Sequence, residues 1–472
     1  MKDRRLVGID LGITSAHTVR ILDGEGTTIA KRKCWPTTES LSEVETEALR
    51  GCAAATALEV VMEPTGPAWL PIAVFFSARG HQVFRVSSQK ASDLRRFLSR
   101  HTKTNGIDAE TLARLPLFDP TGLQALELPT AERAGLDRRV RACDRLTQAG
   151  ATHKRRIKDL MRQLIPMSPL SGDLGVADMA VLERYADPNA LVRLGEKRLG
   201  DLIAKVSHGH QGLERAREWL GAARAALELY EGHPAVAFSD LAAEVASEVR
   251  LLGAVQRELA AHGAVREEAY RVVDPDALAR SLPGLATIGG PALVATMGDP
   301  GRFTQGKQFR SFSGLTPKAS ETGETDRKGQ PMSKAGSSLL RTTLVRAADT
   351  ARKLDPQLAR IYFVQMTERG KDHLGALCVV AANLAERSWA VMARGTPSVI
   401  CDTDGRAVDS EEAKAIIAER FTVPPEVRAR RRSKKSGGKA PKNVLSGQST
   451  PRAQGGSTRG YLPPDVSSAL AS

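Results

Sequence analysis

Three short acidic motifs in the first quarter of the chain constrain its fold most strongly. They read VGIDLG at residues 7–12, VVMEPTG at 60–66 and KTNGIDA at 103–109. The first two follow the pattern of buried strands that end at glycine or proline. Further strands are predicted near residues 15–22, 28–34 and 82–86, with helices near 41–53 and from about residue 68. A meander followed by strands that alternate with helices predicts a mixed sheet with right-handed crossovers.

The rest of the chain has a helical pattern. Apolar residues recur at spacings of three and four between residues 131 and 271, for example at Leu136, Val140 and Cys143. A glycine-rich segment at 282–292 predicts a helix-hairpin-helix-like entry to a second compact unit, with helices at 339–351 and 374–393. We therefore expect four segments. These are an α/β domain at 1–125, a helical arm at 126–275, a helical domain at 276–400, and an extension at 401–472 that is basic and disordered from residue 424.

The net charge of the chain favours a polyanionic partner. It is +14, and residues 424–472 hold ten Lys or Arg against two acids, which is more than half of the excess. Aromatic residues make up only 4%, so a base-stacking surface for single strands is not expected. The tail either binds phosphate groups or keeps the protein soluble. The basic helix after residue 131 either contacts nucleic acid or has a charged face that is simply solvated. The basic residues of that helix are Arg138, Arg139, Arg141, Arg145, Lys154, Arg155, Arg156, Lys158 and Arg162.

The cysteines and the hydropathy of the chain narrow its class further. Five scattered cysteines, without a Cys-x-x-Cys pair, predict neither a zinc site nor a disulfide framework. No apolar run approaches the roughly 20 residues that span a bilayer, and no cleavable N-terminal apolar segment is present. We therefore expect a cytoplasmic protein without a membrane partner.

The acidic motifs supply carboxylates at or near the ends of regular elements. Asp10 is expected in the middle of a buried strand, where aspartate is rare and costly unless it faces a ligand or an edge. Glu63 is expected just beyond another strand, where its carboxylate can point at the same edge. Hard ions such as Mg²⁺ bind such oxygens and assist phosphodiester cleavage. Each motif also has a local interpretation: a capped turn at Asp10, a strand exit at Glu63, and a helix start with Asn105 as N-cap and Asp108 at the third helical position.

Taken together and in this order, the motifs resemble those of the insertion-sequence-110 family of bacterial transposases. The second half of the resemblance is carried by GDPGRF at 298–303, FSGLTP at 312–317 and MSKAG at 332–336. The resemblance covers residues 5–120 and 278–395. It implies an RNase H-like N-terminal domain, similar to Holliday-junction resolvases, with an Asp-Glu-Asp-Asp cluster for Mg²⁺ or Mn²⁺. It also implies a C-terminal domain with a hydroxyl nucleophile, and guidance by a noncoding RNA from the element itself.

Two positions depart from the family's pattern. Asp10, Glu63 and Asp108 match the first, second and fourth acids of the family's Asp-Glu-Asp-Asp cluster. Asn105 stands at the position of the third acid. Its side-chain carbonyl can still bind a cation, but the site has one negative charge fewer. Thr322 stands where the family has its serine, and Ser320 lies two residues before it. The resemblance thus implies a metal site at the first four residues and attack by Thr322 or, failing that, Ser320. The expected nucleic-acid contacts are Gly284, Gly289, Lys318, Arg327, Lys328, Lys334 and Arg341. The alternative role of the glycines is close helix packing or turn formation, and that of the basic residues is solubility.

The sequence therefore predicts a transposase that cleaves and rejoins DNA. Its expected partners are the element ends, target DNA, a guide RNA and further copies of itself in a dimer or tetramer, in the cytoplasm or on the nucleoid. A non-catalytic nucleic-acid-binding remnant is an alternative, because Asn105 and Thr322 replace family residues. An actin-like ATPase or sugar kinase is another, since residues 7–15 resemble its first phosphate loop and DTDG at 402–405 is a loose candidate for the second.

Overall fold

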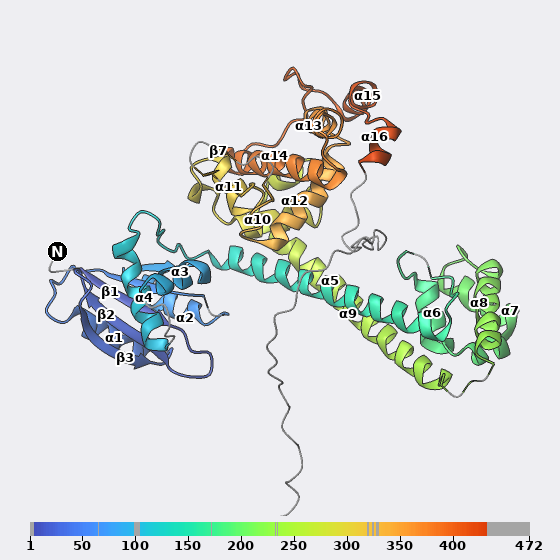
Figure 1. Cartoon of the computed structure of the whole chain (residues 1–472), viewed down its shortest axis with the longest axis horizontal. Helices are drawn as coiled ribbons and strands as arrows, with labels where there is room; N and C mark the ends of the chain where they lie inside the picture. The colour runs from blue at the N-terminus through green and yellow to red at the C-terminus, as the bar shows by residue number, and fades with distance from the viewer. Residues whose placement is uncertain are drawn as a thin grey trace, which may run out of the picture.

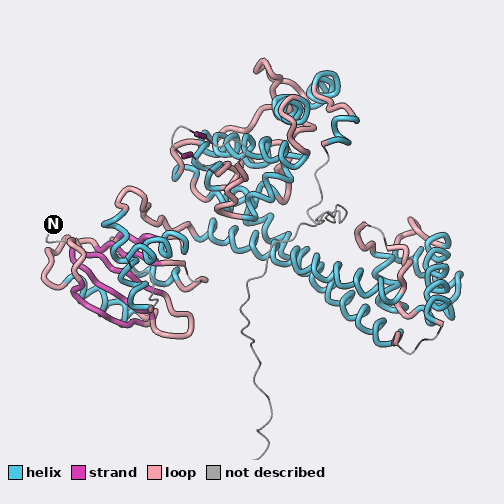
Figure 2. Tube along the Cα trace, in the orientation of Figure 1, coloured by secondary structure: helices cyan, strands magenta, loops and turns pink. Residues whose placement is uncertain are grey.

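The computed structural model has three parts, an α/β domain, a helical arm and a helical C-terminal module (Figure 1). It describes residues 4–64, 66–98, 104–170, 172–231, 233, 235–318, 321–322, 325–326 and 330–431. Within these residues the main sheet lies in the N-terminal domain, and a two-stranded hairpin lies in the C-terminal module (Figure 2). The predicted class, an α/β domain followed by helical regions, is confirmed.

The N-terminal domain is built on a five-stranded mixed sheet with the strand order β3-β2-β1-β4-β5. Its elements are β1 (Arg5–Asp10), β2 (His17–Asp23), β3 (Thr28–Cys34), α1 (Thr38–Leu49), β4 (Leu58–Met62), α2 (Trp69–Ser77), β5 (Gln82–Arg85), α3 (Ser88–Leu98) and α4 (Asn105–Phe118). β1 pairs antiparallel with β2 and parallel with β4, and β4 pairs parallel with β5. The predicted meander and the parallel crossovers are both present.

Side chains alternate between the two faces of this sheet. Val7 and Ile9 lie in a core with residues of α1 and α2. Gly8 and Val61 are paired on the other face, where Val61 packs with Leu112 of α4. The helix α4 therefore covers the face that carries Gly8 and, by the same alternation, Asp10.

The helical arm is a long helix pair that carries a small helical tip. α5 (Ala131–Leu164) and α9 (Phe238–Val273) lie side by side (Figure 1). The tip consists of α6 (Val176–Tyr185), α7 (Pro188–Val206) and α8 (Leu213–Tyr230). Trp219 is fully buried in the tip, and its indole donates to Asp178 at 3.2 Å. With 34 residues, α5 is about 50 Å long, so it separates the tip widely from the α/β domain.

The C-terminal module is a helical bundle that shares its core with the start of α5. Its elements are η1 (Leu278–Ser281), α10 (Gly289–Met297), η2 (Pro300–Arg302), α11 (Gly306–Phe312), β6 (Glu321–Thr322), β7 (Thr325–Asp326), α12 (Ser338–Ala351), α13 (Pro356–Thr367), α14 (His373–Arg394), α15 (Ser410–Arg420) and α16 (Pro425–Arg430). Leu136 and Val140 of α5 belong to the same buried cluster as Leu293 of α10. The predicted helices at 339–351 and 374–393 are present as α12 and α14.

Two expectations about this module are corrected. The first element of the predicted helix-hairpin-helix-like entry is the short 3₁₀ turn η1, because Pro283 and the left-handed Gly284, with φ of 81°, do not continue a helix. Residues 425–430 form α16 although disorder is predicted from residue 424, since Val423 is buried and Arg431 donates to the Gly370 carbonyl. Residues 432–472 lie outside the described part of the chain.

One helix in the described ranges, α14, is long and apolar enough to span a membrane by length and composition. Leu377, Val380 and Leu384 of this helix are buried in the core of the C-terminal module. Core helices pass the same test, so α14 is accounted for as part of the bundle.

Candidate active site

Asp10 and Glu63 lie at the same edge of the sheet. β1 and β4 are parallel neighbours with Ile9 opposite Met62, and Asp10 and Glu63 are the next residues along each chain. Both are half-buried. Asp10 is the last residue of β1, so the expectation that it lies in the middle of a strand is wrong. The strand end is a less costly position for a carboxylate than the strand centre.

The helix α4 packs so closely on β1 that only glycine fits between them. A Cβ atom at Gly8 would lie 1.9 Å from the Ala109 carbonyl oxygen and 2.4 Å from the Ala113 nitrogen. Leu6 packs with Ala113 and Leu117, so α4 runs opposite to β1. The first residues of α4 therefore extend past Gly8 towards the end of β1 that carries Asp10.

The N-terminus of α4 is capped one residue earlier than expected. Thr104 is the N-cap, and its Oγ1 accepts a hydrogen bond from Ile107 N at 3.3 Å. Asn105 is the first helical residue and is exposed. The prediction of Asn105 as the cap is wrong, because threonine at the preceding position already makes the capping bond.

Asp108 is held by an arginine that no sequence pattern indicates. Arg95 Nη1 of α3 donates to Asp108 Oδ1 at 2.9 Å, and the two side chains are only 23% and 18% exposed. The two side chains therefore form a largely buried ion pair. Arg95 lies in the last turn of α3, where basic residues are common because they complement the helix dipole, so its position alone gave no signal.

The donor types at this edge fit a hard divalent cation, since carboxylate and amide oxygens are its preferred ligands. Within the described ranges, no three His, Cys, Asp or Glu side chains lie close enough together to share an ion in this arrangement. Arg95 provides the positive charge next to Asp108. A metal that used Asp108 would therefore have to displace Arg95 or share the carboxylate with it.

His17 fixes the bend that follows Asp10. Its Nδ1 accepts a hydrogen bond from Gly12 N at 3.1 Å, and the side chain is buried. Burial lowers the pKa of His17, so the ring is neutral at pH 7. With Nδ1 as the acceptor, the ring proton lies on Nε2. The neutral ring orients the Asp10 loop and adds no charge to it.

Thr322 lies in a β-hairpin of the C-terminal module. The stem pairs Pro317 with Met332, and farther out β6 pairs antiparallel with β7. Thr322 is the partner of Thr325 in this pairing. Ser320, Arg327 and Lys328, which were also predicted to act here, lie outside the described residues.

Two glycines lock the base of this hairpin. Gly314 and Gly336 both have left-handed backbones, with φ of 72° and 84°. A Cβ at Gly314 would lie 2.0 Å from the Ala335 carbonyl oxygen, and one at Gly336 would lie 2.0 Å from that of Phe312. The backbones at the two ends of the loop therefore lie in close contact, and a residue larger than glycine does not fit at position 314 or 336.

Some of the predicted nucleic-acid contacts have structural roles. Arg341 Nη1 donates to the carbonyls of Ser313, at 3.4 Å, and Lys334, at 3.2 Å, and so supports the hairpin base. A Cβ at Gly284 would lie 2.3 Å from the Ala347 carbonyl, so close packing on α12 explains this glycine. Contacts of these residues with nucleic acid, and those of Gly289 and Lys318, stay predictions.

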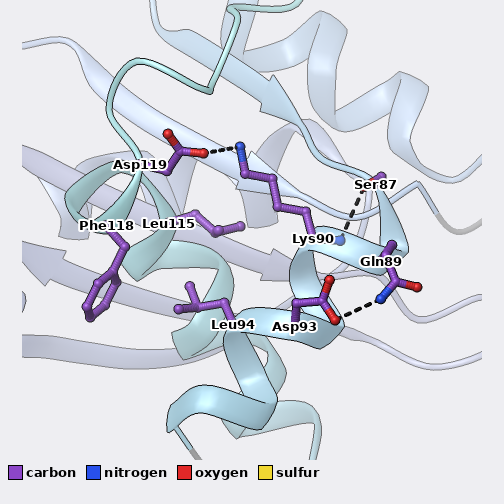
Figure 3. Close-up of a pocket in the computed structure, with 8 residues that line it drawn as sticks. All are labelled: Ser87, Gln89, Lys90, Asp93, Leu94, Leu115, Phe118 and Asp119. Atoms are coloured by element: carbon purple, nitrogen blue, oxygen red, sulfur yellow. Dashed lines mark hydrogen bonds and ion pairs between the residues drawn. The ribbon is translucent and has the colours of Figure 1, made fainter. Parts of the chain in front are cut away.

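A cavity of about 420 Å³ lies on the α/β domain at the far end of α4 from Asn105 (Figure 3). It is lined by Ser87, Gln89, Lys90, Asp93, Leu94, Leu115, Phe118 and Asp119. Lys90 Nζ binds Asp119 at 2.6 Å, and Asp93 pairs with Arg96 at 3.0 Å, so the charges in its wall are already paired. None of the candidate metal ligands lines this cavity.

Comparison with known proteins identifies the family. A family model described as Transposase, of the DEDD type of IS110, matches residues 7–166. A second, described as Transposase IS116/IS110/IS902 family, matches residues 276–363. The chain belongs to the IS110 family of transposases. In this transposase the first match includes Asp10, Glu63, Asn105 and Asp108, and the second includes Thr322.

Curated relatives agree with this assignment. The transposase is 25% identical to the insertion element IS110 uncharacterized 43.6 kDa protein of Streptomyces coelicolor, over 83% of this chain and 94% of that protein. It is 28% identical to a transposase for insertion sequence element IS1328 of Yersinia enterocolitica, over 30% of this chain and 41% of the relative. It is 32% identical to a probable family 20 transposase of Pseudomonas aeruginosa, over 25% of this chain and 35% of that protein.

Proposed function

We propose that this transposase cleaves and rejoins DNA strands with the Thr322 hydroxyl as nucleophile and a divalent cation, Mg²⁺ or Mn²⁺. The proposed ligands are Asp10, Glu63 and Asp108, with the side-chain carbonyl of Asn105 as the fourth. The contact of α4 with Gly8 carries this proposal, because it directs the start of α4 to the edge where β1 and β4 end. The bound cation would stabilise the charge that develops on the phosphate.

The hydroxyl step is proposed as a direct transfer. Thr322 Oγ1 attacks the phosphorus, one phosphodiester bond breaks, and the proton of the threonine hydroxyl ends on the departing strand. The product is an ester between Thr322 and one DNA end, which retains the bond energy for rejoining to a new partner. Lys318 and Lys334, at the hairpin stem, are proposed to hold the DNA backbone together with Arg327 and Lys328.

The two halves of the proposed site belong to different parts of the chain. Asp10 lies in the α/β domain before α5, whereas Thr322 lies in the module that follows α9 (Figure 1). We infer that they meet when nucleic acid is bound, either by a domain movement or between copies in a dimer or tetramer. A guide RNA from the element is proposed as a further partner, and the cytoplasm as the site of action.

Junction PCR for excised circles tests the proposal in cells that carry the gene within its native flanking DNA. We expect circles with the wild type and with Thr322→Ser, which keeps the hydroxyl, and none with Thr322→Ala or Asp10→Ala. Circles that persist in Thr322→Ala would move the nucleophile assignment to Ser320. Equal expression of all variants, checked by immunoblot, is the control.

A non-catalytic nucleic-acid-binding protein is the second candidate. The ion pair between Arg95 and Asp108 favours it, because that carboxylate already has a cationic partner. DNA binding without circles from the wild type would support this alternative. The ATPase alternative has no structural support, since Asp402 of the DTDG segment is held in a turn by Arg420 and the Thr403 amide.

A further inference from the structure

A backbone hydrogen bond joins β5, the last strand of the α/β domain, to the segment just before α5. Leu126, in the segment before α5, donates its backbone N–H to the Val83 carbonyl of β5 at 2.6 Å. Arg85 is the last residue of β5, and its guanidinium lies 4.4 Å from the centre of the Trp69 ring. This cation–π contact holds the guanidinium at the margin of the domain.

The C-terminal module reaches the same part of α5 from the other side. Arg133, in the first turn of α5, donates to the Gly298 carbonyl just before η2. Arg302 ends η2, and its guanidinium lies 4.7 Å from the ring centres of both Phe303 and Phe312. Arg302 is therefore also held close to aromatic rings, on a turn that is tied to α5.

Arg85 lies two residues after Val83, which is bonded to Leu126, and Arg302 lies four residues after Gly298, which is bonded to Arg133, so both belong to the junction at the start of α5. Burial and the nearby charge of Arg85 lower the pKa of Arg302, and burial and the charge of Arg141 on α5 lower the pKa of Arg85. Although partly covered, both residues keep solvent-exposed surface, and no ion pair joins either one to a carboxylate within the described ranges. Of the acids nearby, Asp137 is bound to Arg141 at 2.8 Å, and Asp299 accepts from the Gly301 amide. Glu127 also acts on Arg302 but does not pair with it.

Two further features extend this positive charge. Arg85 lines a cavity of about 230 Å³ together with Ser87, Lys90 and Gln124. On α5, the exposed Arg138, Arg141 and Arg145 share one helix face, because they are spaced by three and four residues. The junction thus presents cations from three separate parts of the chain.

We propose that Arg85 and Arg302 form one seat for the phosphodiester backbone of a nucleic acid, and that the arginines of α5 extend this seat. The inference rests on the proposed function, in which a nucleic acid is the substrate. A guanidinium presents its N–H groups in a planar fork, which matches phosphate oxygens. A phosphate between the two arginines would remove their repulsion and tie the α/β domain to the C-terminal module.

The salt dependence of binding tests this seat. The full chain is titrated with a short fluorescein-labelled DNA duplex at increasing salt in EDTA, so that strand cleavage plays no part. We expect the double variant Arg85→Gln/Arg302→Gln to lower the slope of log affinity against log salt by about 0.9, the value for one phosphate contact on duplex DNA, and each single variant to lower it by less. Arg85→Lys keeps the positive charge, so the slope should not change. The affinity should fall, because lysine lacks the planar pair of N–H donors that arginine offers to a phosphate.

An exposed arginine at the distal tip provides the control. Arg198→Gln removes the same charge from α7 and should leave the slope unchanged. A parallel titration with a single-stranded RNA, for which each contact contributes about 0.7, shows whether DNA or RNA occupies the seat. Equal slopes for the double Arg85/Arg302 variant and the wild type on both probes would overturn the proposal. Because no catalysis is measured, this result is independent of circle formation.

Discussion

At the scale of single residues, Gly8 is the position on which the approach of α4 to the sheet depends. We expect Gly8→Ala to push the helix away from β1, because its Cβ would overlap the Ala109 carbonyl oxygen. Overpacking of this kind costs about 1–3 kcal/mol, and circle formation should fall with it. Chemical denaturation and junction PCR measure the two effects.

Gly135→Ala is the matched control for this change. A Cβ at Gly135, in the first turns of α5, would meet no atom within 4 Å. The substitution should stabilise the protein by about 0.5–1 kcal/mol, because alanine loses less backbone freedom in a helix. Equal losses of stability in the two variants would contradict the role assigned to Gly8.

The individual site residues were predictable only in part. The order of the acidic motifs indicated Asp10, Glu63 and Asp108, and the strand pairing places the first two at one edge. Arg95 was not predictable, because its contact with Asp108 depends on how α3 packs on α4. Metal binding and nucleophilic attack stay predictions.

At the scale of elements, the cap of α4 sets where the helix begins beside the sheet edge. Thr104→Ala removes the hydrogen bond to Ile107 N and should cost about 1 kcal/mol in free energy of unfolding. Since Asn105 and Asp108 follow directly, fraying of this turn should also reduce circle formation. Thermal melting and junction PCR measure the two quantities.

The N-cap of α1 offers a control in the same domain. Thr37 Oγ1 accepts from Ser40 N at 3.3 Å, the same distance as in the α4 cap. Thr37→Ala should therefore cost a similar amount of stability and leave circle formation close to the wild type. A similar loss of circles in both variants would show that stability alone, and not the start of α4, matters.

The elements themselves followed from the sequence more closely than their contacts. The five strands agree with the predicted ranges because alternation and flanking glycines mark them locally. The 3₁₀ turn at Leu278–Ser281 and the helix at Pro425–Arg430 were not predicted, since packing against the module stabilises these short segments. Contacts such as Arg133 with Gly298, separated by 165 residues, have no local signature.

At the scale of the whole molecule, an exposed apolar stripe on α9 is our candidate surface for the proposed dimer or tetramer. Leu251, Val265 and Val272 are 47%, 37% and 64% exposed, and they are separated by multiples of seven residues. Such spacing is typical of a helix seam that packs against another helix, although Glu258 occupies the intervening position. We expect a second copy of the transposase to cover this stripe.

Charge substitution in the stripe tests the dimer or tetramer. The double variant Val265→Glu/Val272→Glu should raise the dissociation constant of self-association about tenfold or more, measured by sedimentation equilibrium. Leu229→Glu, at an apolar position of α8 that is 65% exposed, should change it little. The same constant in the wild type and the double variant would assign the oligomer contact to another surface.

The clasp of Gly314 and Gly336 has a consequence for the divergence of this family. Because the base of the hairpin is held by the close contacts of Gly314 and Gly336 and by Arg341, the chain between the two glycines can vary in length and composition while the bundle below stays intact. The threonine that the resemblance places at the family's serine position, Thr322, would be a change of this kind. Selection can therefore exchange the side chain at position 322 without rebuilding the fold that carries it.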